Sequence, residues 1–265
     1  MKVAIVTPVF NRADSMHRSL LSSLALVNAG IACQLVVVDD ASTDDSVCQI
    51  KSKYSAEIAD GKLILVELPK NLGVSGAKNA GAVAAAADWI IFMDSDDWFV
   101  PAAVGALCNE LNQHPAYAAV FFRCQDQTSG QLVGRPAVAE DLTLTTLVNT
   151  GTPGECLPVV RRADILAIPY PTELRGSEGL TYLAMLHSGR KIYLSDIIAR
   201  EYDNSGADRL SSRQGLRKRA GYLVRHNLRS LRYARYARPK TVAGWLIRIV
   251  YYSGMVIMNK ISRVN

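Results

Sequence analysis

The run Asp94-Ser95-Asp96-Asp97 places three carboxylates within four positions, directly after the apolar residues 89–93. Carboxylates so close together raise one another's pKa unless positive charge lies among them. A divalent cation held by carboxylate oxygens, with substrate phosphates as its other ligands, is the usual source of that charge. The run therefore indicates chemistry on a phosphorylated substrate. The alternative is an acidic turn that caps the next helix, since Asp and Ser are common helix caps.

Two further polar clusters, Thr7-Pro8 and Asp39-Asp40, also stand at the ends of strand-like apolar stretches. Such stretches alternate with helical ones, which predicts an α/β fold with a doubly wound, mostly parallel sheet flanked by helices. Ligands bind outside the carboxyl ends of the strands in such sheets, so we expect all three clusters on one rim. The expected strands are residues 3–7, 35–38, 63–66, 89–93, 118–122 and 192–198, and the expected helices are one that follows Asp14-Ser15 and those at 42–58, 75–87, 101–113 and 177–187.

The composition fits one large domain with an appendage, since the chain has 265 residues, of which 49% are hydrophobic and 20% charged. Its five cysteines include no CxxC pair and its four histidines are scattered. We therefore expect neither a zinc site nor a disulfide framework. No secretory signal is visible at the amino terminus, so we expect a cytoplasmic protein.

Four segments in the first hundred residues share their sequence and their order with a known family. They are Thr7-Pro8-Val9-Phe10-Asn11-Arg12, Val36-Val37-Val38-Asp39-Asp40-Ala41-Ser42-Thr43-Asp44, Asn71-Leu72-Gly73-Val74-Ser75-Gly76-Ala77-Lys78-Asn79-Ala80-Gly81 and Phe92-Met93-Asp94-Ser95-Asp96-Asp97. These segments resemble the motifs of family 2 glycosyltransferases with the GT-A fold, with Lys78 where Arg is usual. The resemblance is strong over residues 1–100, fair to about residue 205 and absent beyond.

The resemblance implies transfer of a sugar from a nucleotide sugar, most often UDP-linked, to an acceptor hydroxyl, usually with inversion. Asp39 would accept a hydrogen bond from the base, and Lys78 would lie near the base or the diphosphate. Asp94 would contact the ribose and metal region, and Asp96 would be the principal ligand of Mg²⁺ or Mn²⁺. That ion would act as a Lewis acid on the departing diphosphate. The other implied residues of the nucleotide-sugar pocket are Thr7, Pro8, Asn11 and Ser95.

An inverting transfer also needs a general base that takes the proton of the acceptor hydroxyl. The family places Asp or Glu before a helix that is followed by Gly, and here Glu178 and Gly189 occupy those places. The resemblance therefore implies Glu178 as the base. The chain departs from the family's acidic pair, because Ser177 and Gly179 flank this single carboxylate. The alternative is a Glu at a helix N-terminus, favoured by the helix dipole.

A second departure lies near residue 203, where many relatives have a His that helps to hold metal or diphosphate. Residues 200–206 contain no His, and Asp203 or Asn204 would substitute only weakly. Residues 209–211 are a candidate for a loop that closes over the diphosphate.

The carboxyl-terminal residues 206–265 carry 14 Lys/Arg and one Asp, whereas residues 1–205 carry 16 Lys/Arg and 23 Asp/Glu. Residues 214–237 predict one long basic helix, and residues 241–258 contain one charge, Arg248. This second stretch is short for a membrane span and its central Arg is costly there. We expect a shallow helix on an anionic membrane surface. The alternative is a helical hairpin packed on the catalytic domain, and no motif favours a nucleic-acid partner.

We therefore predict a glycosyltransferase domain at residues 1–205, with a nucleotide-sugar half to about residue 100, and a basic helical tail at 206–265. The predicted function is metal-dependent, inverting sugar transfer in bacterial surface polysaccharide or lipopolysaccharide synthesis. The expected acceptor is a saccharide or lipid-linked saccharide, and the expected location is the inner face of the cell membrane. One alternative is a catalytically silent, membrane-associated binding module with the same fold. A nucleotidyltransferase is the other, but its Gly-rich loop after the first strand is missing.

Overall fold

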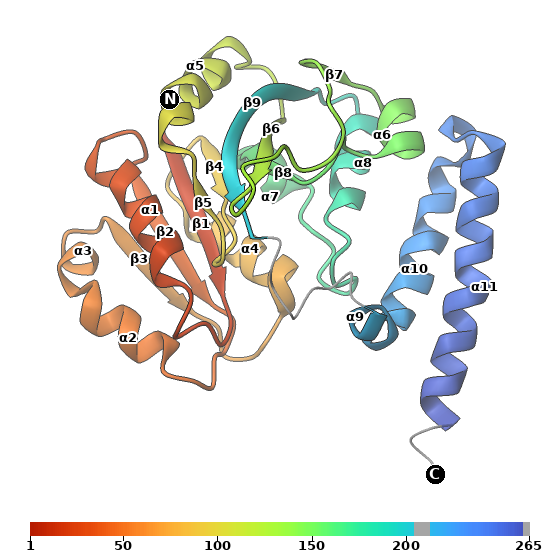
Figure 1. Cartoon of the computed structure of the whole chain (residues 1–265), viewed down its shortest axis with the longest axis horizontal. Coiled ribbons are helices and arrows are strands. Elements are labelled where there is room, and N and C mark those ends of the chain that lie inside the picture. Colours follow the sequence, from red (N-terminus) through yellow and green to blue (C-terminus); the bar gives the residue numbers. More distant parts are fainter. Residues whose placement is uncertain (204–212, 262–265) are drawn as a thin grey trace.

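The carboxyl ends of three parallel strands lie side by side at one edge of the sheet. The computed structural model describes residues 1–203 and 213–261. In it β1 lies between β2 and β4, and β3 lies beyond β2 (Figure 1). Val9 lies opposite Asp39 across β1 and β2, and Val6 lies opposite Phe92 across β1 and β4. These strands are β1 (Val3–Val9), β2 (Gln34–Asp39), β3 (Leu63–Glu67) and β4 (Trp89–Phe92).

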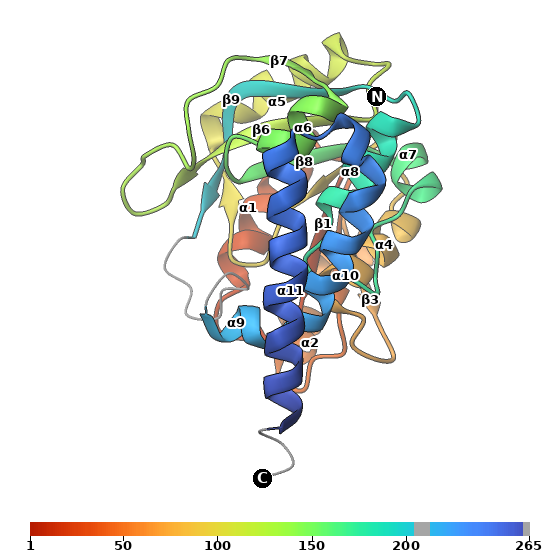
Figure 2. The same cartoon turned by 90° about the vertical axis from the view of Figure 1, so that its right-hand side faces the viewer.

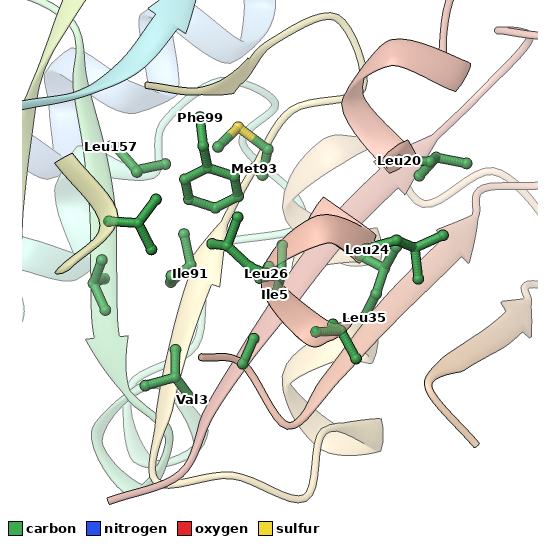
Figure 3. Packing of buried hydrophobic residues seen from close by; sticks show 14 of the residues in the cluster. Val3, Ile5, Leu20, Leu24, Leu26, Leu35, Ile91, Met93, Phe99 and Leu157 are labelled. Atoms are coloured by element: carbon green, nitrogen blue, oxygen red, sulfur yellow. The ribbon is translucent and has the colours of Figure 1, made fainter. Parts of the chain in front are cut away.

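Helices cover both faces of these strands because the strands are apolar on both sides. Alternate residues such as Ile5 pack against Leu20 and Leu24 of α1 (His17–Asn28), and Figure 3 shows this packing. The intervening residues, such as Val6, pack against α4 (Gly73–Ala84). The first face is completed by α2 (Ser46–Lys53), η1 (Pro101–Ala103) and α5 (Val104–Gln113), and α3 (Ser55–Ala59) follows α2 directly.

The second half of the chain extends the same sheet with strands of mixed direction. β8 (Cys156–Arg161) runs antiparallel to β4, and β6 (Ala119–Asp126) lies between β8 and β9 (Ile192–Tyr202). The predicted α/β class, with a largely parallel sheet between helices, is confirmed. The remaining elements of this half are β5 (Trp98–Phe99), β7 (Glu140–Leu142), α6 (Leu144–Thr150), α7 (Arg162–Ala167) and α8 (Gly179–His187).

Several predicted elements have different bounds in the structure. The strand predicted at 118–122 continues to Asp126 in β6, and the helix predicted at 75–87 is α4 at Gly73–Ala84. The helix predicted at 42–58 begins only at Ser46, and Tyr54 interrupts it between α2 and α3. Tyr54 is buried there, and its hydroxyl lies 2.9 Å from Nδ1 of His17. The strand predicted at 192–198 continues to Tyr202, which brings Arg200 into the sheet.

The carboxyl-terminal region forms several helices, so the prediction of one helix over 214–237 is wrong. The chain leaves the helix at Arg219, whose Nη1 donates a hydrogen bond to the carbonyl oxygen of Arg175. The following helices α10 and α11 form an antiparallel hairpin beside the sheet domain (Figure 2). The elements are α9 (Arg213–Lys218), α10 (Ala220–Ser230), η2 (Leu231–Tyr236) and α11 (Pro239–Ile261).

Candidate functional site

The loops after β1 and β2 are joined to each other at the rim. The backbone N–H of Asn11 donates to Ser42 Oγ at 2.9 Å, and the backbone N–H of Thr43 donates to Asn11 Oδ1 at 2.8 Å. Asn11 and Ala41 have positive φ angles of 51° and 60°. Ala rarely adopts this conformation, and strain of this kind concentrates at functional sites. The amide of Asn11, implied by the resemblance to line the nucleotide pocket, therefore also fixes the loop after β2.

The two carboxylates at the end of β2 differ in their partners. Asp40 is buried, and its Oδ1 accepts a hydrogen bond from the backbone N–H of Leu72 at 2.6 Å. Burial raises the pKa of Asp40. Asp39 is 3% exposed, and its Oδ2 accepts from the backbone N–H of Ser42 at 3.0 Å. Its Oδ1 is buried with no hydrogen-bond partner among the described residues, so this oxygen has an unused capacity to accept a hydrogen bond.

β1 contains two residues that the resemblance implies for the same pocket, and it continues beyond them to Val9. Thr7 and Pro8 are both buried. Thr7 Oγ1 has no hydrogen-bond partner in the described part of the chain. Buried hydroxyls are normally paired, so this oxygen is a second buried polar atom near the end of β1 whose hydrogen-bonding capacity is unused.

Positive charge lies among the carboxylates that follow β4. Lys78 Nζ is 2.8 Å from Asp94 Oδ1, and Arg200 Nη1 is 3.6 Å from Asp94 Oδ2. Burial alone would raise the pKa of Asp94, but Lys78 and Arg200 outweigh it and hold that pKa below its ordinary value. Asp94 is therefore ionised without a bound cation, which the sequence had not indicated. Lys78 therefore pairs with Asp94 in the structure, and its position near the base or the diphosphate stays a prediction.

Arg200 is a site residue that sequence reasoning missed. It is 2% exposed, and its Nη1 is 3.1 Å from Asp97 Oδ2. Burial raises the pKa of Asp97 to about 7, even though Arg200 opposes this shift. Asp97 Oδ1 also accepts a hydrogen bond from the backbone N–H of Asp203 at 2.9 Å. β9 also contains Ser195, Asp196 and Glu201, so the pattern of the strand gave no signal that singled out Arg200.

Asp96 is the exposed carboxylate of the same run, and Ser95 beside it is buried. The protein around its carboxyl group still removes part of its hydration, and this partial desolvation, together with the charge of Asp94, raises the pKa of Asp96. The described residues contain no group of three His, Cys, Asp or Glu side chains that could hold a metal ion. Asp96 and the partly engaged Asp94 nevertheless offer hard oxygen donors, which suit a Mg²⁺ or Mn²⁺ ion that takes its other ligands from diphosphate and water.

Glu178 lies just before α8 and is half-buried. Its side chain makes no cap bond to that helix, although its place at the helix N-terminus is the one that the helix dipole favours for a carboxylate. Glu178 Oε1 instead accepts a hydrogen bond from Ser75 Oγ of α4 at 2.7 Å. Ser75 and Lys78 are three residues apart, on one face of α4. One helical turn therefore connects Glu178 with Asp94.

The loop before Glu178 is contacted by the carboxyl-terminal hairpin. Nδ1 of His226 on α10 lies 3.0 Å from Ser177 Oγ. The hydrogen bond from Arg219 to Arg175 holds the start of the same loop. Asn204 and the predicted loop residues 209–211 lie outside the described part of the chain. A surface depression of about 380 Å³ lies along β3, and none of Asp39, Asp94 and Asp96 lines it.

The parallel strands, the polar residues at their carboxyl ends and the covering helices define an α/β fold whose polar strand ends lie along one edge of the sheet. The model of the family described as "Glycosyl transferase family 2" matches residues 4–148, more than half of the chain. The chain therefore belongs to glycosyl transferase family 2.

Several curated relatives match the first part of the chain. The succinoglycan biosynthesis protein ExoO of Rhizobium meliloti (strain 1021) is 38% identical over 99 residues, which are 37% of this chain and 26% of ExoO. The poly(ribitol-phosphate) beta-N-acetylglucosaminyltransferase TarP of Staphylococcus aureus (strain N315) is 30% identical over 110 residues, 41% of this chain and 32% of TarP. The matches thus span about a quarter to a third of these relatives.

Two solved structures share the fold. S. aureus TarS 1-349 in complex with UDP-GlcNAc has a TM-score of 0.69 at 19% identity, over 94% of this chain and 72% of that one. The mannosyltransferase PcManGT from Pyrobaculum calidifontis, in complex with GDP-Man and Mn²⁺, has a TM-score of 0.63 at 17% identity, over 100% of this chain and 81% of that one. The predicted GT-A fold is thereby confirmed.

Proposed function

We propose that this chain is a metal-dependent, inverting glycosyltransferase that moves a sugar from a UDP-linked donor to an acceptor hydroxyl. The unpartnered Oδ1 of Asp39 supports a base with an N–H donor, such as uracil. The relatives named for succinoglycan synthesis and for poly(ribitol-phosphate) modification support a bacterial surface polysaccharide as the product class. The proposed acceptor is a saccharide or lipid-linked saccharide at the inner face of the cell membrane.

The observation that carries this proposal is the placement of Ser75 and Lys78 on one turn of α4. Ser75 donates to Glu178 on the acceptor side, and Lys78 pairs with Asp94 on the donor side. The helix thus fixes a candidate base relative to the carboxylates that would meet the diphosphate. Such fixed geometry is what positioning contributes to a group transfer.

In the proposed reaction Glu178 accepts the proton of the acceptor hydroxyl while that oxygen attacks the anomeric carbon. The bond from Ser75 holds one carboxylate oxygen, Oε1, and leaves the other for the acceptor. Asp96 would hold the ion, and a bound Mg²⁺ or Mn²⁺ would supply Lewis-acid stabilisation of the leaving diphosphate. Lys78 and Arg200 keep Asp94 charged and fixed beside Asp96.

The test is a screen of nucleotide sugars for Mn²⁺-dependent release of nucleoside diphosphate, with and without candidate acceptors. We expect Glu178→Gln to lower kcat by about a hundredfold or more, with the donor Kd little changed. Asp96→Asn should raise the Mn²⁺ concentration needed for half-maximal activity. Glu173→Gln and Asp60→Asn, at two exposed carboxylates outside the site, are the controls.

A wild-type rate of sugar transfer by Glu178→Gln would show that Glu178 is not the general base. If the activity of Asp96→Asn depends on the Mn²⁺ concentration as that of the wild type does, Asp96 does not hold the ion. A second candidate function is a silent nucleotide-sugar binding module, favoured by the single carboxylate between Ser177 and Gly179. Donor binding without turnover for every sugar and acceptor tested would favour that candidate.

A further inference from the structure

Helix α11 exposes an apolar face. Its exposed positions recur every three or four residues and are almost all uncharged, which is the reverse of a helix that faces water. Ile247 is 68% exposed and Val250 is 73% exposed. In Figure 2 α11 runs along the outside of the molecule, over the edge of the domain. We call the following set the α11 apolar face: Ala243, Leu246, Ile247, Val250, Tyr251, Gly254, Ile257 and Met258.

The opposite face of α11 is already occupied by the rest of the chain. Trp245 is 7% exposed and packs in a cluster with Leu174, Leu180 and Leu183, close to Glu178. The start of the helix is held by Asn149, whose Oδ1 accepts from Thr241 Oγ1 at 2.9 Å. The α11 apolar face is therefore the side of a firmly docked helix that the chain itself leaves uncovered.

Positive charge surrounds this face. The residues from 213 to 261 include no Asp or Glu. Exposed cations lie in η2 at Arg232 and Arg235 and in the first turn of α11 at Lys240. At its other end, Asn259 Nδ2 donates to the carbonyl oxygen of Arg217 at 3.0 Å, which places α9 and its exposed cations there. An apolar stripe bordered by cations is complementary to an anionic lipid surface.

We propose that the α11 apolar face and its bordering cations dock the protein flat on an anionic bilayer, with the helix axis parallel to the membrane plane. This inference deepens the membrane location proposed above by naming the surface and its orientation. The 21 residues Pro239–Asn259 of α11 are long and apolar enough to span a membrane by length and composition alone, and 6% of the apolar stretch is buried. Spanning would place the exposed Arg248 at mid-membrane and separate Trp245 from its cluster, both of which are costly.

The flat orientation has a consequence for the catalytic loop. α10 packs along α11 and contacts the loop before Glu178 through Arg219 and His226. Docking of the hairpin thus fixes Glu178 at a set height above the lipid headgroups. A fixed height of Glu178 above the headgroups suits an acceptor that reaches the site from the bilayer. The role of Glu178 toward that acceptor rests on the proposed function.

The first test is flotation of the full chain with vesicles, without donor or acceptor, so that its failure is separate from a failure of transfer. We expect binding to phosphatidylcholine vesicles with roughly a third phosphatidylglycerol, and little binding to phosphatidylcholine alone. The triple variant Ile247→Ser/Val250→Ser/Ile257→Ser should lose about tenfold or more of the bound fraction. The matched control, with equally exposed residues elsewhere, is Leu21→Ser/Val83→Ser/Val138→Ser.

The contribution of charge is tested with Arg225→Gln/Arg232→Gln/Arg235→Gln, three exposed cations of the hairpin. This variant should bind anionic vesicles about tenfold less, and added salt should weaken the wild type in the same way. The control is Lys2→Gln/Lys53→Gln/Lys70→Gln, three exposed cations of the sheet domain.

Orientation is tested by nitroxide labels on Ala243→Cys, Val250→Cys and Ile257→Cys, after both exposed cysteines, Cys33 and Cys48, are replaced by Ser. A flat helix gives equal, shallow depths at all three positions, whereas a spanning helix gives graded depths. Graded depths, equal binding to neutral vesicles, or unchanged binding by the serine variant would each overturn the proposal. So would a concentration-dependent dimer that only the serine variant disrupts, because that result assigns the face to a second copy.

Discussion

Thr7 Oγ1 and Asp39 Oδ1 are buried oxygens without a hydrogen-bond partner among the described residues, and both belong to the proposed nucleotide pocket. A buried polar atom left unpaired costs about 1–3 kcal/mol, so a fold keeps such atoms where a ligand pairs with them. Asp40, the next residue, is instead fully used in fixing the loop to α4. We therefore propose separate roles for the two adjacent carboxylates: Asp40 fixes the loop, and Asp39 accepts from the base.

Asp39→Asn should weaken UDP binding by about tenfold or more. One carboxylate oxygen accepts from Ser42 and the other is proposed to accept from the base, so an amide has to present its NH₂ group to one of these two donors. Isothermal titration calorimetry with UDP, alone and with Mn²⁺, measures the change. Wild-type affinity in the variant would show that the free oxygen of Asp39 does not meet the base.

Lys78→Met should lower the free energy of unfolding by about 1–2 kcal/mol, because Asp94 loses its nearest counter-charge inside the site. This loss of stability is smaller than the loss expected for a fully buried ion pair, because Asp94 is partly exposed and retains Arg200 as a partner. Urea unfolding of Lys78→Met, Asp94→Asn and the double variant measures the coupling, which we expect to be about 1 kcal/mol. Additive effects would mean that the pair contributes nothing to stability.

At the scale of elements, α4 is the part that connects the site to the core. The first turns of α4 carry Ser75 and Lys78, and a later turn places Gly81 against Val6 of β1. A Cβ added at Gly81 would lie 2.3 Å from Val6 Cγ1, so only Gly allows this close approach. The distance between α4 and β1 therefore sets where Ser75 and Lys78 meet Glu178 and Asp94.

Gly81→Ala should lower the free energy of unfolding by about 2 kcal/mol, because helix and strand have to separate to admit the methyl group. Gly105→Ala is the matched control, since Gly105 lies in α5 with open space around its Cβ position. That change should be neutral or stabilise by up to about 1 kcal/mol. Thermal and urea unfolding of both variants check this, and equal effects would contradict the role of close packing.

At the scale of the whole molecule, the hairpin is both packed on the catalytic domain and apolar on its outer side. The two alternatives for the carboxyl-terminal region, a packed hairpin and a membrane-facing helix, thus apply to opposite faces of α11. Removal of the hairpin would expose Leu174, Leu180 and Leu183, which pack against Trp245 of α11. It would also remove the contact of His226 with the loop before Glu178. Surface substitutions therefore test membrane docking more cleanly than truncation does.

Acid should destabilise the contact between hairpin and domain through His226. Burial, with Arg248 and Arg219, lowers the pKa of His226, although Glu178 opposes this. Below its ordinary pKa of about 6.5 the unfolded chain therefore binds a proton that the folded chain does not, and the free energy of unfolding falls. In His226→Gln the fall between about pH 8 and about pH 5.5 should be smaller, as measured by urea unfolding. An identical pH dependence in the variant would exclude His226 as the cause.

Much of the parallel half was predictable because its information is local. Each buried strand is a short apolar run, and each polar cluster follows directly, so β1, β2 and β4 and their acidic ends were found close to their observed bounds. The breaks at Tyr54 and Arg219 were not found, since burial of a ring and a bond to a distant carbonyl decide them. The site roles of Glu178 and Asp96 remain predictions.

The sequence by itself determined the fold class, the family and the row of polar strand ends, because apolar periodicity and contiguous motifs are properties of neighbouring residues. Only the tertiary structure decided which charges meet: Lys78 and Arg200 neutralise Asp94, and Ser75 joins Glu178 to the same helix. It also decided which face of α11 is covered. These contacts join segments far apart in the chain, and their energies depend on distance and burial, which exist only once the sheet and its helices have assembled.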